Sequence, residues 1–445
     1  MGVAYALNSK TVLRAGYGIF YDYINVGRLN STALWNSGFG FTPAFASTNG
    51  DITPAFNLNN GFPVTPVTLP DLNPALNNNG TATWVNGSSA LPAEVQNWTF
   101  DVERDLPGQI TLDAAYVGSH AIHTWTGLEN INQVNPQFLS LGNTLLANIN
   151  SPAAAAAGIL PPYPGFQGSV AQGLRPFPQY TTLYDTYQPT GYDNYDSLQI
   201  RLQKRFSNGL SFLGSYTWSK SLGVPGNDTF GDPYGGGGNG SLNTYNRSNM
   251  YAVSPLNIPQ DFVFSWMYEL PVGRGKRFLS NLGPVANQIV GGWQFNSIET
   301  YTSGSPIGVG GGPFLPLFNG INNVPNWVSS NVRTSTGTGN FNPGVDRYLN
   351  INAFSQPAPF TFGNAPNILP NTRTPAFYDE DFSLFKKFYI TEDKYLEFRA
   401  EGFNIFNRIV FGGPSTDFNS PNTFGTIGYQ ANTPRVIQLA LKFIF

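Results

Sequence analysis

The sequence predicts an all-β fold, and three observations support this prediction. Apolar and polar residues alternate along several segments, as in strands that present one face to an apolar environment and the other to water. Glycine (49), proline (35) and aromatic residues (15%) are abundant, whereas charged residues make up 11% of the 445 residues, against roughly 25% in a typical soluble domain. Short turns alternate with long loops. We therefore expect an antiparallel transmembrane β-barrel, incomplete in this chain, with about ten strands.

The composition argues against several other classes of protein. Cysteine is absent, so disulfides and thiolate sites are excluded. With only His120 and His123 available, any metal site would depend mainly on oxygen ligands. The formal charge of −3 gives no reason to expect a nucleic-acid partner. No uninterrupted apolar run approaches the roughly 18 residues of a transmembrane helix. We expect no cofactor.

Residues 194–222 show the strand pattern most clearly. From Leu198 to Leu202, apolar residues alternate with polar or cationic ones. The dipeptide Asn208-Gly209 follows, and it readily takes the positive φ of a tight hairpin turn. The alternation then resumes and ends in the aromatic residues Tyr216 and Trp218. Each run has about the 9–11 residues with which a tilted strand crosses a bilayer, so the segment predicts a β-hairpin.

The same alternation predicts the other strands. Together with 194–207 and 210–222, we expect strands over residues 9–22, 97–103, 110–116, 260–270, 292–302, 379–389, 394–401 and 435–445. Residues 3–7 are expected to end an earlier strand. The alanine run 153–157 lies between Pro152 and Gly158, which leaves both a loop and a short helical turn open.

The connections differ systematically in length. Short ones are expected near residues 105–109, 207–209 and 390–393, a moderate one over 271–291, and long ones over 22–93, 120–193, 222–258, 303–378 and 407–434. Outer-membrane barrels have short periplasmic turns and long external loops. A soluble sandwich spreads its turns more evenly.

Seven segments carry a more specific pattern. They are GYGIFYD (16–22), AYVGSH (115–120), YDSLQIRLQKRFSNGLSFLGSYTWSKSL (195–222), YELPVGRGKRF (268–278), GGWQ (291–294), EFRAEGFNIFNRIVFG (397–412) and PRVIQLALKFIF (434–445). In this order they resemble the C-terminal half of the barrel of Oar-like TonB-dependent outer-membrane proteins. The resemblance implies a parent protein in the bacterial outer membrane with about 22 strands, an internal plug and a TonB box near its N-terminus.

This chain departs from that pattern at its N-terminal side. It contains no recognisable plug or TonB box, and Met1 to Ala4 has neither the basic nor the apolar region of a signal peptide. Such a chain is either cytoplasmic or lacks the start of the complete gene product. We expect the second: residues 1–445 form a single partial barrel domain, and contact with TonB requires a missing N-terminal region. The other expected partners are outer-membrane lipid and the barrel-assembly machinery, while the ligand stays open.

The alternation also assigns side chains to the two faces of the sheet. The residues expected to face the lumen are Gln199, Arg201, Gln203, Arg205, Glu397, Arg399 and Glu401. The aromatic residues expected in a membrane girdle are Trp98, Tyr216, Trp218, Trp266, Tyr268 and Phe443. The resemblance implies that Leu441, Phe443 and Phe445 form the C-terminal signal for barrel assembly.

Two patterns have features of nucleotide or calcium sites, but both have simpler explanations. Residues 273–276 (GRGK) are similar to part of a phosphate loop, yet Leu270 replaces its first glycine and Arg277 follows the lysine, so we expect a solvated turn. The carboxylate groups that could ligate calcium lack the spacing of a calcium loop. They are Asp193 with Asp196, Asp228 with Asp232, and Asp379 with Glu380 and Asp381.

Three further patterns also have simpler explanations. Glu397, Arg399 and Glu401 include the carboxylates that a glycosidase needs, but a lumen-facing charge ladder is the simpler role. Two histidines three residues apart are a weak metal signal, and a polar loop entry is favoured. The girdle aromatics suit sugar stacking, but their phase on the apolar face favours a membrane boundary.

The sequence therefore predicts a segment of a TonB-dependent-type transporter or receptor rather than an enzyme. Its long external loops are expected to capture the ligand. Two alternatives stay open: a non-transporting surface or adhesion barrel, and a soluble all-β ligand-binding protein whose apolar faces pack inward.

Overall fold

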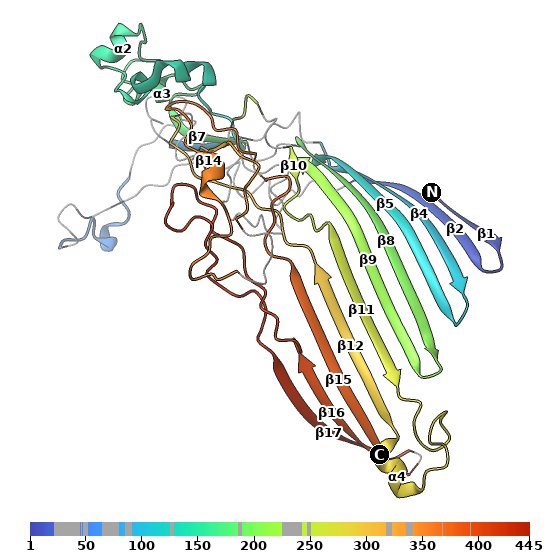
Figure 1. Ribbon diagram of the computed structural model, residues 1–445. Coiled ribbons are helices and arrows are strands. Elements are labelled where there is room, and N and C mark those ends of the chain that lie inside the picture. Colours follow the sequence, from blue (N-terminus) through green and yellow to red (C-terminus); the bar gives the residue numbers. More distant parts are fainter. Residues whose placement is uncertain are drawn as a thin grey trace.

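The chain forms one large antiparallel sheet with folded loops at one end (Figure 1). The computed structural model describes residues 1–21, 45, 47, 52–64, 80–84, 91–124, 129–185, 189–224, 243–246, 251–316, 323–334, 341–366, 368–391 and 393–445. Within these residues the main sheet has twelve strands, and eleven follow one continuous path. The path runs through β1 (Gly2–Asn8), β2 (Thr11–Tyr21), β4 (Glu94–Leu106), β5 (Ile110–Thr124), β8 (Gly191–Ser207), β9 (Leu210–Val224), β11 (Gln260–Glu269), β12 (Trp293–Thr302), β15 (Phe377–Tyr389), β16 (Tyr395–Phe403) and β17 (Val436–Ile444).

The sheet confirms the predicted fold class. All ten expected strands are present, and β1 is the earlier strand whose end was expected at residues 3–7. Each path strand pairs antiparallel with the path strands before and after it. The sheet is not closed, because β1 pairs within the described chain only with β2 and β17 only with β16. The twelfth strand, β10 (Ala252–Val253), pairs with β9.

Several strands exceed their predicted bounds. β5 runs on to Thr124 and β8 begins at Gly191, so both enter a segment that was expected to be loop. The prediction was wrong there because the apolar and polar alternation fades beyond Tyr116. Asp105 and Leu106 likewise belong to β4 rather than to the turn.

The two ends of the sheet differ, as the connection lengths predicted. At the turn end, the end with short connections, β8 and β9 are joined by Asn208 and Gly209 alone, with φ of 52° and 80°. Both values are positive, as the predicted hairpin requires. The longest connection at the turn end carries the helix α4 (Pro284–Val290).

At the opposite end, the loop end, the long connections fold into a body of their own. Its elements are β3 (Gly80–Trp84), β6 (Glu129–Asn130), η2 (Pro136–Leu146), α2 (Pro152–Ala156), α3 (Val170–Gly173), β7 (Tyr180–Asp185), β13 (Asn326–Trp327), η4 (Ile351–Ala353) and β14 (Phe354–Ser355). The turn η1 (Leu58–Asn60) lies in the connection between β2 and β4 and has no buried residue. The alanine run forms α2, whose first turn is capped by the Ser151 side chain accepting a hydrogen bond from the Ala154 N–H. The helical turn was therefore the correct alternative.

The hydrophobic cores lie in this loop body rather than in the sheet. One cluster contains Leu145 and Val170, and the other contains Leu349 and Phe424; neither has a buried member on the eleven path strands. In β17, by contrast, Leu439 and Leu441 are 66% and 64% exposed. A soluble sandwich would pack such side chains inward, so the exposed face favours an apolar surrounding. None of the helices among the described residues is long and apolar enough to span a membrane.

Candidate functional site

One face of the sheet is polar across its width. Between β2 and β4, the Arg14 guanidinium contacts Asp101 at 2.9 Å and Glu103 at 2.8 Å. Glu103 lies opposite Asp113, which lies opposite Arg201 on β8. The acidic groups of β4 and β5 thus lie between basic groups on β2 and β8, so each acidic strand has a basic neighbour on a wet surface.

The predicted lumen-facing residues belong to this polar face. On β8, Arg201 donates to Gln203 at 3.0 Å, and on β16 Arg399 contacts Glu397 at 2.6 Å. Glu401 lies on the same face as Arg399, opposite Ser383. The register thus places six of the seven predicted residues on one face, and their exposure to a lumen stays a prediction.

Arg205 is the exception. The β8–β9 register shifts between Lys204 and Ser207, and such a β-bulge interrupts the strict alternation of faces. Beside the bulge, the Lys204 ammonium donates to the Gly108 carbonyl at 2.7 Å. The face of Arg205 therefore cannot be inferred by counting from Arg201.

The opposite face carries the predicted girdle residues. Cross-strand pairs join Tyr216 to Phe262, Phe262 to Tyr301 and Tyr301 to Tyr378. The Phe262 and Tyr301 rings stack at 6.0 Å with an angle of 3° between their planes. Neighbouring aromatics on a sheet stabilise each other in this way.

The individual girdle residues differ in their surroundings. The Trp98 ring lies over Gly118, where a Cβ atom would approach it to 2.3 Å. Trp266 donates to Glu299 at 3.1 Å, and Phe443 stacks on Phe445, one residue beyond β17. The register places all six residues, including Trp218 and Tyr268, on the apolar face. Their position at a membrane boundary stays a prediction, as does the assembly signal at Leu441, Phe443 and Phe445.

Two charged side chains on the apolar face have polar partners close to the ends of the strands. Near the loop end, Glu380 is 1% exposed and accepts two bonds of 2.8 Å from Arg408 Nε. This contact raises the pKa of Arg408. Near the turn end, the buried Lys386 donates to the Gly291 carbonyl and lies 5.4 Å from the Trp293 ring centroid.

A cavity of about 900 Å³ lies at the loop end, where β5, β8 and β9 meet the loop body. The strands contribute Tyr116, Leu198 and Trp218, which occupy one cross-strand row. The loops contribute Tyr251 and Trp327. Trp218 is 59% exposed, so its indole ring is open to an incoming molecule.

A fixed polar group lies in the wall of this cavity. Asn257 is 3% exposed, and its side-chain and main-chain oxygens accept bonds of 2.6 and 2.7 Å from Arg373. Burial lowers the pKa of Arg373. The Asn257 Nδ2 donor is buried, and no described group accepts a hydrogen bond from it. A buried donor without an acceptor is costly and uncommon in folded proteins.

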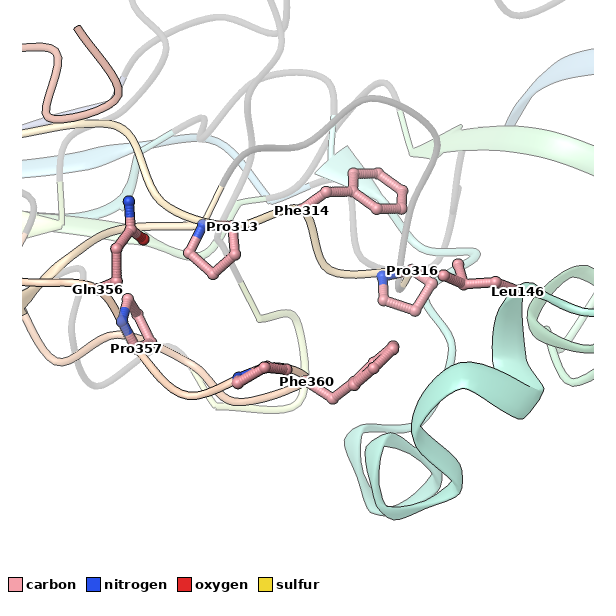
Figure 2. A pocket seen from close by; sticks show the side chains of 8 residues that line it. Leu146, Pro313, Phe314, Pro316, Gln356, Pro357 and Phe360 are labelled. Carbon is pink, nitrogen blue, oxygen red and sulfur yellow. The ribbon is translucent and has the colours of Figure 1, made fainter.

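A second, smaller cavity of about 340 Å³ lies entirely in the loop body. Figure 2 shows Phe314 and Phe360 on opposite sides of it, with Leu146 and Pro316 beside them. Its lining is almost wholly apolar, and Gln356 supplies the one polar side chain among the described lining residues.

The alternatives for calcium and nucleotides gain no support. Asp196 accepts a 2.5 Å hydrogen bond from the Tyr116 hydroxyl, and Asp381 accepts a hydrogen bond from the Asn404 N–H. Both carboxylates therefore already have hydrogen-bond donors within the protein. Asp228 and Asp232 lie outside the described residues. Residues 273–276 form part of a turn in which the Arg274 N–H donates to Asn287.

The two histidines lie near the end of β5, as the polar loop entry requires. His120 pairs with Asn194 at 2.7 Å, and His123 has a φ of 57°. In the part of the chain that the structure describes, no group of three His, Cys, Asp or Glu side chains could hold a metal ion.

Sequence reasoning missed the cavity and the partners of the two charged side chains on the apolar face. Asn257 and Arg373 are 116 residues apart, and nothing in either local sequence marks a contact. The sequence could have indicated the two charged side chains, however, because Glu380 and Lys386 occupy positions of β15 where the alternation predicts apolar residues.

Comparison with known proteins identifies the family. Residues 1–438 match the family model described as "Outer membrane beta barrel domain". The chain belongs to this family. It is therefore a protein of the bacterial outer membrane, and no curated protein matches it.

Several solved structures of outer-membrane receptors and transporters are similar to this chain and longer than it. They include the outer membrane transporter YddB from Escherichia coli (9% identity, TM-score 0.43, covering 98% of this chain and 39% of that one). Also similar are the ferric-catecholate import receptor Fiu from Escherichia coli K12 (11%, 0.39, 100% and 34%) and the siderophore receptor PiuA from Acinetobacter baumannii (10%, 0.39, 100% and 35%). The chain spans between 34% and 39% of their lengths.

Proposed function

We propose that residues 1–445 are the C-terminal part of a larger outer-membrane barrel that acts as a receptor or transporter of the TonB-dependent type. The observation that carries this proposal is the difference between the ends of the sheet: a folded loop body at one end and minimal turns at the other. The resemblance of seven strand segments to Oar-like proteins supports it. The chain has no enzymatic role in this proposal.

In the proposed mechanism the loop end is external and captures the ligand. The polar face, with Arg14, Arg201 and Arg399, lines the passage through the barrel, and the apolar face contacts lipid. Energy reaches the barrel through a TonB box and a plug in a region outside this chain.

The orientation is testable because the chain contains no cysteine. A single cysteine can therefore be placed at Ala156 in the loop body or at Asp393 in a turn, both exposed positions. A membrane-impermeant maleimide should label Ala156→Cys in intact cells. It should label Asp393→Cys only after the outer membrane has been permeabilised. The reverse pattern would contradict the proposed orientation.

Transport is tested in cells with the intact gene, without the gene and without TonB. Growth is compared on panels of sole sources of iron, vitamins and carbohydrate. We expect at least one source on which the two deletions cause the same growth defect, and restoration by the intact gene. Equal growth on every source would contradict transport and favour the non-transporting surface or adhesion barrel. That alternative would then be tested by comparing the adhesion to surfaces of cells with and without the gene.

A further inference from the structure

The connection between β11 and β12 is folded, and it carries the helix α4 at the turn end of the sheet (Figure 1). The Asn287 side chain of α4 accepts a hydrogen bond of 2.6 Å from the Arg274 N–H, which joins the helix to the preceding turn. The Gln288 side chain donates to the Tyr389 carbonyl at 2.7 Å, which joins the helix to the end of β15. The connection therefore holds a fixed position on the sheet.

The apolar side chains on one side of α4 are exposed. Val285 and Ile289 are four residues apart, so they lie on the same side of the helix, and they are 78% and 67% exposed. The polar side chains of Asn287 and Gln288 instead contact the rest of the chain. A helix on the surface of a soluble protein has the opposite arrangement, with its apolar side toward the core. The helix α4 is thus suited to an apolar surrounding.

The position of α4 continues the apolar face of the sheet. The Trp293 indole donates to the Ile289 carbonyl at 3.1 Å, and Lys386 donates to the carbonyl of Gly291, the C-cap residue of α4. Trp293 and Lys386 lie opposite each other on β12 and β15, in phase with Tyr301 on the apolar face. Both contacts fasten the C-terminal end of α4 to the edge of the face that contacts lipid in the proposed function.

Three cations accompany the exposed apolar side chains. Residues 271–291 contain Arg274, Lys276 and Arg277 but no aspartate or glutamate. All three cationic residues are exposed. Lys276 lies 3.5 Å from Glu269, whereas Arg274 and Arg277 form no ion pair within the described chain. Their charges can therefore attract an anion from outside the chain.

The residues after these cations also favour an apolar surrounding. Leu279 has a φ of 55°, a strained conformation for any residue other than glycine, and it is 56% exposed. Phe278 is 53% exposed. Neither backbone conformation nor burial within the protein favours a leucine at this position, whereas contact with acyl chains would.

Exposed apolar side chains beside unpaired cations match the boundary of a membrane, where acyl chains lie next to anionic headgroups. We propose that residues 271–291 anchor the barrel to anionic phospholipid in the periplasmic leaflet of the outer membrane. Val285, Ile289 and Leu279 lie among the acyl chains, and Arg274 and Arg277 bind the phosphate groups. The choice of leaflet rests on the proposed function, in which the turn end is periplasmic.

The depth of α4 is measured with a single fluorescent probe, because the chain contains no cysteine. Val285→Cys and the control Asp393→Cys are labelled with nitrobenzoxadiazole in the intact gene product, after any cysteine outside residues 1–445 has been replaced by serine. Asp393 is an exposed residue in another connection at the turn end. In nanodiscs that contain phosphatidylglycerol, a nitroxide on the acyl chains should quench the Val285→Cys probe, and aqueous iodide should quench the Asp393→Cys probe. Quenching of both probes by iodide would overturn the anchor.

The role of the cations is tested by titrating phosphatidylglycerol or phosphatidylcholine into the labelled Val285→Cys protein in a nonionic detergent. Arg274→Gln and Arg277→Gln should each lower the affinity for phosphatidylglycerol about fivefold. Arg277→Lys keeps the charge, so its affinity should be retained. Unchanged affinity in both glutamine variants, or equal binding of the two lipids to the otherwise unaltered protein, would overturn the assignment to anionic headgroups.

The result is separable from the transport proposal. Lipid contact at Val285 without any growth defect that depends on TonB would retain the anchor and remove transport. A growth defect that depends on TonB, with the Val285→Cys probe in water, would retain transport and remove the anchor. Labelling of Asp393→Cys in intact cells would overturn the choice of leaflet. Protection of the Val285→Cys probe from iodide only by added periplasmic protein would overturn the anchor and indicate a protein partner.

Discussion

Glu380 shows how a single charge is accommodated on the apolar side of the sheet. Its carboxylate is 1% exposed and accepts hydrogen bonds from Arg408 and from the Tyr301 hydroxyl. A buried carboxylate is tolerated only when such partners replace its lost water.

Removing only Arg408 should lower the stability of the protein more than removing the charges of both Glu380 and Arg408. Arg408 is half-exposed, so we expect Arg408→Gln to cost about 1–3 kcal/mol, below the range for a fully buried pair. The double variant Glu380→Gln with Arg408→Gln should recover part of this loss. Both variants are compared with the unaltered protein by the temperature at which heating abolishes the faster gel migration of the folded barrel. Equal values for the single and double variants would mean that Glu380 is not left unpaired.

Tyr348 should make the loop body sensitive to alkaline pH. It is 2% exposed and donates to the Arg373 carbonyl at 2.7 Å. Burial raises its pKa above the ordinary value of about 10. The unfolded side chain releases its proton first, so the contribution of Tyr348 is intact below pH 10 and is lost as pH rises through the folded pKa.

Tyr348→Phe tests this pH dependence. At pH 8 the variant should be less stable by about 0.5–1.5 kcal/mol, the net value of one hydrogen bond. Above pH 10 the difference should narrow, because the phenylalanine cannot ionise. Thermal unfolding followed by near-ultraviolet circular dichroism at both pH values measures it, and a constant difference would contradict the expected ionisation.

At the scale of elements, the β8–β9 hairpin depends on Gly209. A Cβ atom there would lie 2.8 Å from the Glu269 carbonyl oxygen, and φ is 80°. Gly275, also at the turn end, has φ of 72° but no atom within 4 Å of its Cβ position. The two glycines therefore share conformational strain but differ in crowding.

Gly209→Ala should lower stability more than Gly275→Ala. Gly275→Ala, the control, should lower the free energy of unfolding by about 1 kcal/mol because of the positive φ alone. Gly209→Ala adds a clash with the backbone of β11. The yield of folded, heat-modifiable barrel after refolding compares them. Equal yields would show that the hairpin can move away from Glu269.

At the scale of elements, the sequence predicted the features that depend on neighbouring residues and missed those that depend on distant segments. β8 and β9 were predicted because alternation and the Asn208-Gly209 turn are local signals. The face of Arg205 could not be predicted, since a bulge depends on the partner strand. The loop body and the contact of Asn257 with Arg373 depend on segments far apart in the chain, where no periodic pattern exists.

At the scale of the whole molecule, the open sheet leaves the outer edges of β1 and β17 without a strand partner in the described chain. Unpaired backbone N–H and C=O groups are costly in hydrocarbon. We expect that residues 1–445 produced alone in detergent form oligomers or remain sensitive to protease. A monodisperse, protease-resistant monomer by light scattering would contradict the need for further strands.

The connectivity of the main path has a consequence for how such a sheet can change over generations. Every path strand pairs with the path strands directly before and after it in the chain, so no path strand lies between two paired strands in the sequence. Loss or duplication of one hairpin in the gene would leave the remaining pairings intact. The circumference of the sheet can therefore change in steps of two strands, while each loop evolves independently of the sheet that carries it.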